Sequence, residues 1–315
     1  MHIGPLKLRN AVALAPMAGL SDVPFRTLAW RMGVGYMVSE MVSSKPELWE
    51  TGKSRLRRLP VPGADPVAVQ IAGSDPQVMA DAARRHVDDG VQVIDINFGC
   101  PAKKVCRKAA GSALLSDPAL IGRIVGAVAL AVNVPVSVKT RTGLTPGDDK
   151  GVDAALAAVD NGAAMVVMHG RSRECKFRGR VDFAAVRRLK SRVQVPVLVN
   201  GDIHSVATAN VALAESGADG VMIGRAALGQ PWIFAALTGA RIPNEIEKWH
   251  LIYEHVAMMH DFYGEVPGVG IVRKHVVAYL RHMGCSELTS QFLAIGAAAG
   301  QRQWLADVAL SERAA

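Results

Sequence analysis

A cysteine beside a run of cations is the feature of this sequence that most directly suggests chemistry. The stretch VIDINFGCPAKKVCRKAAGSALL begins at Val93 as an apolar strand and stops at Gly99-Cys100-Pro101, so Cys100 is expected at a strand's carboxyl end. A buried structural cysteine is the alternative, because free cysteines are usually small core residues. The cations that follow on the same loop are Lys103, Lys104, Arg107 and Lys108.

Polar side chains also end several other predicted strands. A lysine inside the run PVSVKTR is costly to bury unless it faces an anion or a polar ligand, so Lys139 indicates function rather than a structural ion pair. His169 alone is equally compatible with a satisfied core histidine, but it lies among these other strand ends. The remaining members of the group are Gln70, Asn97, Arg141, Asn200 and Asp202.

Two glycine turns follow the last two predicted strands. Asn200-Gly201-Asp202 and Gly224-Arg225 offer small residues and exposed backbone N–H groups near a helix N-terminus, which is a common phosphate site in barrel enzymes. Arg225 adds a cation to the second turn. The pair of turns therefore predicts a phosphate-binding site.

Short apolar strands alternate with amphipathic helices along most of the chain. Near-continuous apolar strands separated by helices indicate parallel strands covered on both faces. At three joints Gly90, Gly162 and Gly217 follow a helix, where glycine supports a left-handed stop. Eight such strands predict an α/β fold with a (β/α)8 TIM barrel rather than an open doubly wound sheet. The predicted strands are Ala11–Met17, Tyr36–Met41, Val67–Gly73, Val93–Cys100, Val134–Arg141, Met165–Gly170, Val195–Asp202 and Gly220–Gly224.

The pattern changes after Arg241. The stretches Trp249–Phe262, Val272–Met283 and Ser290–Leu310 carry apolar residues at helical spacing with no β-type run between them. We therefore predict a small helical bundle after the barrel. The expected domains are residues 1–241 and 242–315, and the segment IPNEIEK is the predicted linker.

Composition limits the class of protein. With 315 residues and 50% hydrophobic residues, the chain is expected to bury a sizeable core. The N-terminus MHIGPLKLRN lacks a signal-peptide pattern and no apolar run reaches the length of a membrane span, so we expect a cytoplasmic protein. The four cysteines form no CxxC pair, which argues against a zinc or iron–sulfur site.

Positive charge is concentrated in the predicted barrel. The net charge is +8, with 30 Lys and Arg against 20 Asp and Glu up to Asn244, and 6 against 8 after it. The densest runs, KSRLRR, KKVCRK and RSRECKFRGR, follow the second, fourth and sixth predicted strands. Any single run is most simply a solvated surface, but three runs on one rim favour a nucleic acid as partner.

Eight motifs occur in order along the barrel: APMAGLSD, SEMVSSKP, VQIAGSDP, INFGCPAKKV, VKTRTG, HGRSR, NGDI and GRAALGQPWIF. Together with HDFYG and RKHVVAYL in the helical tail, they resemble the tRNA-dihydrouridine synthases, most closely their bacterial B subfamily. Cys106 departs from the family pattern and adds a second thiol near Cys100.

The resemblance implies a flavin mononucleotide (FMN) enzyme that reduces the C5–C6 double bond of a D-loop uridine in tRNA, with NADPH as electron donor. Cys100 would give a proton to C5 after hydride reaches C6, because a thiol with a pKa of about 8.5 is mostly protonated at neutral pH. The neighbouring cations would lower that pKa, so its surroundings must keep the proton on sulfur. The base must leave its stack to reach a flavin inside a barrel.

The resemblance also assigns residues and partners. Residues 1–241 would be the FMN-binding catalytic domain and residues 242–315 a tRNA-binding domain. We expect a monomer that binds tRNA, no membrane and no metal. The implied FMN contacts are Pro16, Met17, Ala18, Gln70, Lys139, His169, Asn200, Gly201, Asp202, Gly224 and Arg225. The implied substrate contacts are Asn97, Arg141, Lys103, Lys104, Arg107, Arg273 and Lys274.

Two other functions share some of these features. An FMN-dependent barrel enzyme acting on a small molecule, such as a dihydroorotate dehydrogenase or an ene-reductase, would share the phosphate site, but it gives no reason for the three basic runs. A non-catalytic RNA-binding regulator would not need Cys100, Lys139 and His169 together. Flavin absorbance would argue against the regulator, and salt-dependent tRNA binding would argue against the small-molecule enzyme.

Overall fold

The computed structural model describes residues 1–107 and 109–314, which divide into two compact units. The first consists of Met1–Val23 and Val34–Gly224, and the second of Pro24–Gly33 and Arg225–Ala315. The predicted boundary after Arg241 falls inside the second unit, because Trp232 already packs in the core of that unit.

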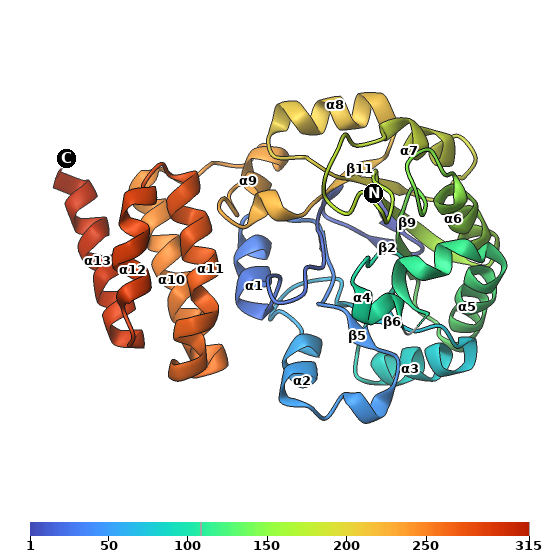
Figure 1. The fold of residues 1–315 in the computed structure, drawn as a ribbon, viewed down its shortest axis with the longest axis horizontal. Coiled ribbons are helices and arrows are strands. Elements are labelled where there is room, and N and C mark those ends of the chain that lie inside the picture. Colours follow the sequence, from blue (N-terminus) through green and yellow to red (C-terminus); the bar gives the residue numbers. More distant parts are fainter. Residues whose placement is uncertain (108, 315) are drawn as a thin grey trace. The chain divides into compact units, whose positions relative to one another are not determined.

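Within the described residues, nine parallel strands of the first unit form one sheet (Figure 1). Their order is β4-β3-β11-β10-β9-β8-β7-β6-β5, so most neighbours in space are also successive in the chain. All eight predicted strands are present, and most are shorter than predicted. The bounds are β3 (Val12–Leu14), β4 (Tyr36–Met37), β5 (Val42–Ser43), β6 (Ala68–Ala72), β7 (Val93–Asn97), β8 (Val136–Arg141), β9 (Ala163–His169), β10 (Val197–Asn200) and β11 (Gly220–Ile223).

A single bridge closes this sheet into a barrel. Val38, directly after β4, pairs in parallel with Ala68 of β6, and β5 continues the pairing with the same strand. β4 and β5 are therefore two parts of one barrel position. The predicted (β/α)8 barrel is confirmed.

Helices alternate with the strands around the barrel (Figure 1). Asp75, Asp117 and Asp182 each accept a backbone N–H at the start of a helix, as expected for N-caps. Gly90, Gly162 and Gly217 have positive φ at the predicted helix ends, which confirms the glycine stops. The helices of this unit are α2 (Gly52–Arg58), α3 (Pro76–Asp88), α4 (Lys103–Cys106), α5 (Pro118–Ala131), α6 (Lys150–Asp160), α7 (Phe183–Lys190) and α8 (Val206–Ser216), with 3-10 turns η1 (Pro46–Leu48) and η2 (Gly111–Ser116).

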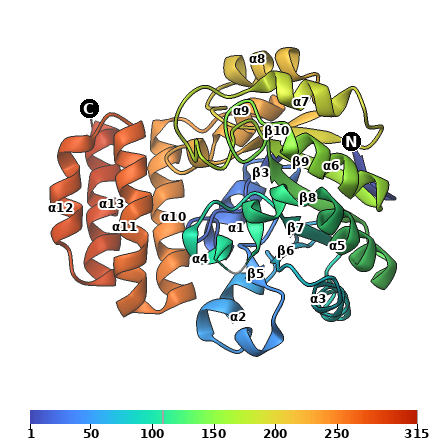
Figure 2. The same cartoon turned by 45° about the vertical axis from the view of Figure 1, so that its right-hand side comes forward.

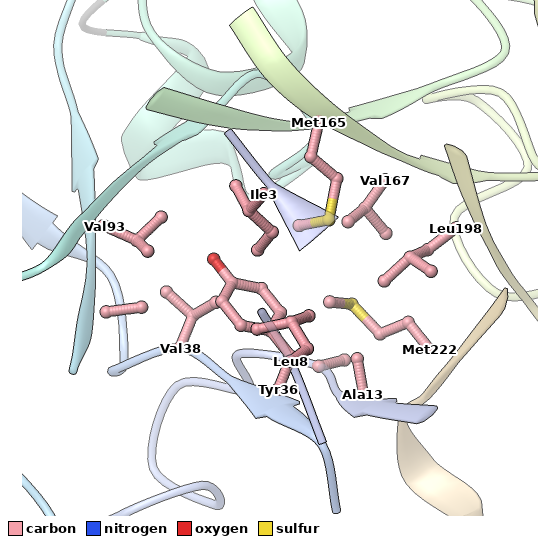
Figure 3. Close-up of a cluster of buried hydrophobic side chains, with 12 residues drawn as sticks. Ile3, Leu8, Ala13, Tyr36, Val38, Val93, Met165, Val167, Leu198 and Met222 are labelled. Atoms are coloured by element: carbon pink, nitrogen blue, oxygen red, sulfur yellow. The ribbon is translucent and has the colours of Figure 1, made fainter. Parts of the chain in front are cut away.

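Side chains fill the barrel interior (Figure 3). An N-terminal hairpin consists of β1 (His2–Ile3) and β2 (Leu6–Lys7). Ile3 of β1 and Leu8, directly after β2, pack against interior residues such as Tyr36 and Met165. Sequence analysis missed this hairpin, because strands of two residues carry no readable alternation. The hairpin and the interior side chains make the barrel a packed core rather than a pore.

The second unit is helical, as predicted, and helices α10 to α13 lie side by side in it (Figure 2). Trp249, Tyr279, Phe292 and Leu305 belong to its buried core. The predicted segment Ser290–Leu310 is two helices rather than one, because Ile295 is extended and ends the first of them. The helices are α1 (Val23–Arg31), α9 (Ile233–Thr238), α10 (Glu245–Tyr263), α11 (Glu265–His282), α12 (Thr289–Ala294) and α13 (Ala298–Ala314), with 3-10 turns η3 (Arg225–Ala227) and η4 (Ser286–Leu288).

Over residues 1–107 and 109–314, no helix combines the length and apolar character needed to span a bilayer.

Candidate active site

Strand register brings the predicted site residues of the barrel together. Asn97 of β7 pairs with Lys139 of β8, and Arg141 at the end of β8 pairs with His169 of β9. His169 in turn pairs with Asn200 of β10. Parallel strands in register place these polar side chains at one end of the barrel, which is where barrel enzymes carry their active sites.

The turn that carries Cys100 is held by hydrogen bonds at both of its ends. Asn97 Oδ1 accepts the backbone N–H groups of Gly99 and Cys100, at 3.1 and 2.9 Å. The Cys100 carbonyl accepts the hydroxyl of Ser112 at 2.9 Å and its backbone N–H at 3.1 Å. These contacts fix the backbone of the cysteine against the loop that follows it.

The environment of the Cys100 thiol keeps it neutral. The residue is half-buried, and burial raises the pKa of the thiol above its ordinary value. The backbone N–H of Ala102 and the cations Arg141 and Lys139 oppose this rise in the pKa without overcoming it. The thiol is therefore suited to donate a proton at neutral pH.

Cys106 lies in the same loop, as expected. Its thiol is 3.6 Å from the Cys100 carbonyl oxygen and 3.7 Å from the hydroxyl of Ser112. It is the last residue of α4 and is also half-buried. A reagent that enters this loop can therefore meet two thiols.

Lys139 and Arg141 are cations without a carboxylate partner at ion-pair distance among the described residues. Lys139 Nζ donates to Asn200 Oδ1 at 3.1 Å, and burial lowers its pKa to about 8. Among the described residues, Arg141 donates to the carbonyls of Gly99 (2.7 Å), Ser172 (3.1 Å) and Lys176 (2.8 Å). Burial lowers its pKa to about 10. Two partly desolvated cations at one end of the barrel favour an anionic or electron-rich ligand.

A buried polar network lies between strands β6, β7 and β8. The Asp95 carboxylate accepts Ser137 Oγ at 2.6 Å and Gln70 Nε2 at 2.7 Å, and Gln70 Oε1 accepts Asn97 Nδ2 at 2.7 Å. Burial raises the pKa of Asp95 to about 6. Sequence analysis read Asp95 only as part of a strand and missed its contact with Gln70, which lies 25 residues away in the chain.

The turn after β10 has the backbone expected of a ligand cradle. Gly201 has φ 131°, and a Cβ there would lie 3.1 Å from His169 Cδ2 and from a methyl of Val181. The carboxylate of Asp202 forms an ion pair with the buried Arg171, with Nη1 2.9 Å from Oδ1. Any contact of Asp202 with a phosphate is therefore expected through its backbone.

The glycine after β11 faces the loop after β3. A Cβ on Gly224 would lie 3.9 Å from Ala15 Cβ and from Met17 Sδ, so two predicted flavin contacts, Met17 and Gly224, are neighbours. Arg225 follows in the second compact unit, and its predicted phosphate contact stays a prediction.

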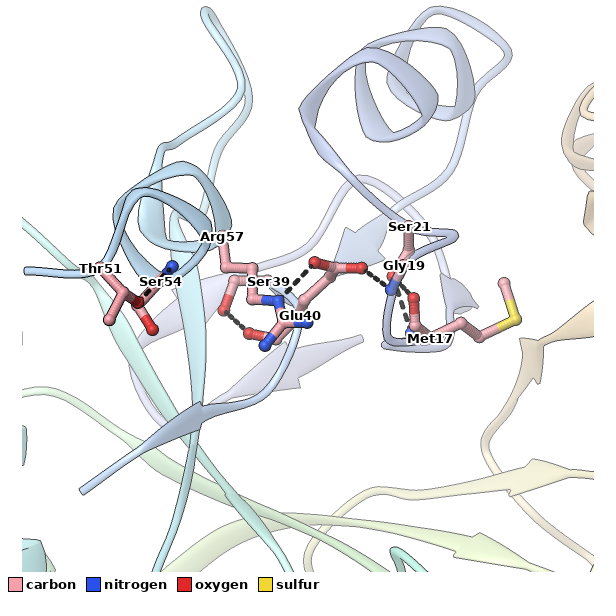
Figure 4. Close-up of polar contacts among 8 residues, drawn as sticks. All are labelled: Met17, Gly19, Ser21, Ser39, Glu40, Thr51, Ser54 and Arg57. Carbon is pink, nitrogen blue, oxygen red and sulfur yellow. Dashed lines mark hydrogen bonds and ion pairs between the residues drawn. The ribbon is translucent and has the colours of Figure 1, made fainter. Parts of the chain in front are cut away.

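Glu40 ties the loop after β3 to helix α2 (Figure 4). Its buried carboxylate accepts the backbone N–H of Gly19 and the guanidinium of Arg57, whose Nε lies 3.1 Å away. The same loop is closed by Ser21, whose hydroxyl accepts the Met17 N–H at 2.7 Å. Sequence analysis missed these two supports of the Pro16–Ala18 segment.

Part of the loop after β9 is buried, although the sequence predicted an exposed basic surface there. Arg171 is buried and bonds the carbonyls of Arg178 and Gly179, so it holds the loop together instead of facing solvent. Phe177 is half exposed, with the Arg141 guanidinium 5.4 Å from its ring centre and the His169 ring at 6.2 Å. Sequence analysis missed this aromatic side chain, which is suited to stack on a base.

Of the predicted tRNA-contacting cations outside the β9 loop, some are exposed and others are not. Lys103, Lys104 and Arg107 are exposed on and after α4, whereas Lys108 lies outside the described residues. In the helical unit Lys274 is exposed, but Arg273 is half-buried and donates to the Ile295 carbonyl at 3.2 Å.

Within residues 1–107 and 109–314, no group of three or more His, Cys, Asp or Glu side chains is placed to hold a metal ion.

Known proteins of similar sequence belong to one family. The family model described as "Dihydrouridine synthase (Dus)" matches residues 13–313. A protein of Salmonella typhimurium named tRNA-dihydrouridine synthase B is 47% identical over 315 residues, 97% of this chain and 98% of its own. The proteins of the same name from Pseudomonas putida (47% identity, 94% of this chain and 90% of its own) and Escherichia coli K12 (46%, 97% and 98%) are similar. The chain therefore belongs to the dihydrouridine synthase family, whose model covers its polar barrel end, its basic loops and nearly all of its helical unit.

Proposed function

We propose that this protein reduces the C5–C6 double bond of a D-loop uridine in tRNA. The observation that carries the proposal is the neutral thiol of Cys100, which lies within electrostatic range of Lys139 and Arg141 at the carboxyl ends of the barrel strands. Reduction of uracil needs a hydride at C6 and a proton at C5, and only the proton can come from a side chain. A thiol whose pKa is raised by burial is a proton donor at neutral pH.

The cofactor of the proposal is FMN, with NADPH as electron donor. The Gly201 cradle, the neighbouring Met17 and Gly224, and two cations without carboxylate partners at ion-pair distance among the described residues fit a flavin with an anionic tail and an anionic reduced form. When bound, FMN would supply the hydride for C6. The residues that would hold it are Pro16, Met17, Ala18, Gln70, Lys139, His169, Asn200, Gly201, Asp202, Gly224 and Arg225.

The side chains of this chain then have separate tasks. Cys100 gives its proton to C5, while Arg141 and Asn97 face the polar edge of the uracil and stabilise the charge that develops on its oxygen. Phe177 offers a stacking surface next to Arg141 for the base that leaves its stack. The proposal thus assigns a role to each polar strand end.

We further propose that the exposed cations of α4 and the helical residues 242–315 bind tRNA phosphates. In the helical part the exposed Lys274 supports this proposal. Arg273 supports it less, because one of its N–H groups already donates to the Ile295 carbonyl. Because the helical part is near neutral overall, its contribution is expected to come from shape as much as from charge.

Neutralising Lys103, Lys104 and Arg107 together is expected to weaken tRNA binding and to flatten its salt dependence. Each lost phosphate contact removes about one unit from the slope of log Kd against log salt. The measurement is a salt series of tRNA affinities. The matched control neutralises Arg84, Arg85 and Arg123, three exposed cations on helices α3 and α5. Equal losses in both variants would show that net charge, rather than the α4 surface, binds tRNA.

Replacing Lys139 by Met is expected to lower the reduction potential of the bound flavin. A charged hydrogen bond contributes about 1.5 to 3 kcal/mol, which corresponds to roughly 30 to 60 mV for a two-electron couple. The measurement is a redox titration of the flavin-loaded protein against a reference dye, and Lys103→Met is the control. An unchanged potential in Lys139→Met would remove Lys139 from the flavin site.

A further inference from the structure

Asp95 is a buried charge for which the proposed reaction has no use. It lies in the middle of β7, is 1% exposed, and has Ser137 and Lys139 of β8 and Gln70 of β6 as its neighbours. At pH 7.5 the carboxylate is ionised, since burial raises its pKa only to about 6. A carboxylate buried at this depth is costly unless hydrogen bonds replace its lost hydration, so its hydrogen-bond partners are the place to look for its role.

A directional chain of hydrogen bonds connects Asp95 with the Cys100 turn. Asp95 accepts from Gln70 Nε2 at 2.7 Å, Gln70 Oε1 accepts from Asn97 Nδ2 at 2.7 Å, and Asn97 Oδ1 accepts from the N–H groups of Gly99 and Cys100. An ionised carboxylate can only accept, and a backbone N–H can only donate. The amide groups of Gln70 and Asn97 therefore each have a single orientation in which every donor of this series meets an acceptor.

We propose that Asp95 is a positioning residue, which sets the direction of this chain and thereby holds the turn that carries the proton donor Cys100. The catalytic consequence rests on the proposed role of Cys100, whereas the effect on the turn does not. A group at position 95 that donates would allow Gln70 to turn over and present its NH2 group to Asn97. Asn97 would then turn its own NH2 group toward the N–H groups of Gly99 and Cys100, and the contact would be lost.

The donor-to-acceptor direction of this series of hydrogen bonds can be reversed by a substitution that keeps the size of the side chain. In Asp95→Asn the side chain keeps its size but gains a donor. Ser137→Ala is the matched control, because it removes a hydrogen bond from the same carboxylate and leaves its acceptor character. The double variant Asp95→Asn/Gln70→Glu restores the direction, since the carboxylate introduced at position 70 accepts from both neighbours and Asn97 keeps its orientation.

The first measurement is amide hydrogen exchange of the peptide segment that contains Gly99 and Cys100, read by mass spectrometry in the flavin-loaded proteins. In Asp95→Asn, exchange of these amides is expected to be about tenfold faster or more, since a lost hydrogen bond of about 1.4 kcal/mol corresponds to that factor. Ser137→Ala is expected to keep the wild-type protection, and the double variant to regain it. Wild-type protection in Asp95→Asn, or equal loss in Ser137→Ala, would overturn the proposal.

The second measurement is a single turnover of prereduced enzyme with tRNA. Asp95→Asn is expected to reduce uridine at least tenfold more slowly, with an unchanged Kd for tRNA. A wild-type rate would overturn the catalytic part of the proposal. If the wild-type enzyme did not reduce uridine at all, the proposed function would fail while the exchange measurement still decided the role of Asp95. Rescue by the double variant Asp95→Asn/Gln70→Glu is judged from amide hydrogen exchange alone. Its rate of uridine reduction is not compared, because Gln70 is also a proposed flavin contact.

Discussion

Cys100→Ala is expected to slow uridine reduction by about two to four powers of ten, the usual contribution of a general acid. Flavin content, flavin reduction by NADPH and tRNA affinity are expected to stay close to normal, because the alanine removes only the thiol. The measurement is a single turnover of prereduced enzyme with tRNA, followed by flavin absorbance. Because burial raises the pKa of this thiol, the wild-type rate is expected to fall only above the ordinary cysteine pKa of about 8.5.

Cys106→Ala is the control for this prediction. Its thiol is 3.6 Å from the Cys100 carbonyl oxygen, so the variant perturbs the same loop without removing the proposed acid. It is expected to be nearly silent in the same assay. A wild-type rate in Cys100→Ala would contradict the assignment, and a slow Cys106→Ala with a fast Cys100→Ala would move the acid to Cys106.

The helical unit is expected to lose stability as the pH falls below about 6.5. His255 and His275 are buried there with ring centres 4.9 Å apart, next to Phe25, Tyr279 and Lys274. Burial lowers the pKa of His255 to about 3 and that of His275 well below its ordinary value. The unfolded chain therefore takes up protons near pH 6.5, whereas the folded unit stays neutral. By linkage this costs about 2 kcal/mol per histidine at pH 5.

The measurement compares urea unfolding of wild type and His275→Phe at pH 7.5 and pH 5. The variant lacks one of the buried histidines of this unit and is expected to lose less stability between the two pH values. His250→Gln is the control, because His250 is exposed on the same helix as His255. If His275→Phe and wild type lost the same free energy of unfolding, the buried histidines would not be the source of the acid sensitivity.

Local patterns in the sequence were enough to predict the element order of the barrel and the position of Cys100 at a strand end. Each of these signals is local. Apolar runs predict strands, Gly90, Gly162 and Gly217 end helices in the left-handed region, and the break at Gly99-Cys100-Pro101 marks a strand end. Spacing within a few residues carries this information, so no knowledge of distant contacts was needed.

The contacts that hold the site in place join residues far apart in the chain, and local patterns do not predict them. The barrel closes through a bridge between Val38, directly after β4, and Ala68 of β6, which are far apart in the chain. Asp95 meets Gln70 across a strand pairing. The burial of Arg171, which looked like a rim cation, depends on carbonyls of its own loop and on Asp202. These partners lie 7 to 31 residues apart in the chain. Sequence periodicity does not report them, because strand register and loop closure determine which polar groups meet.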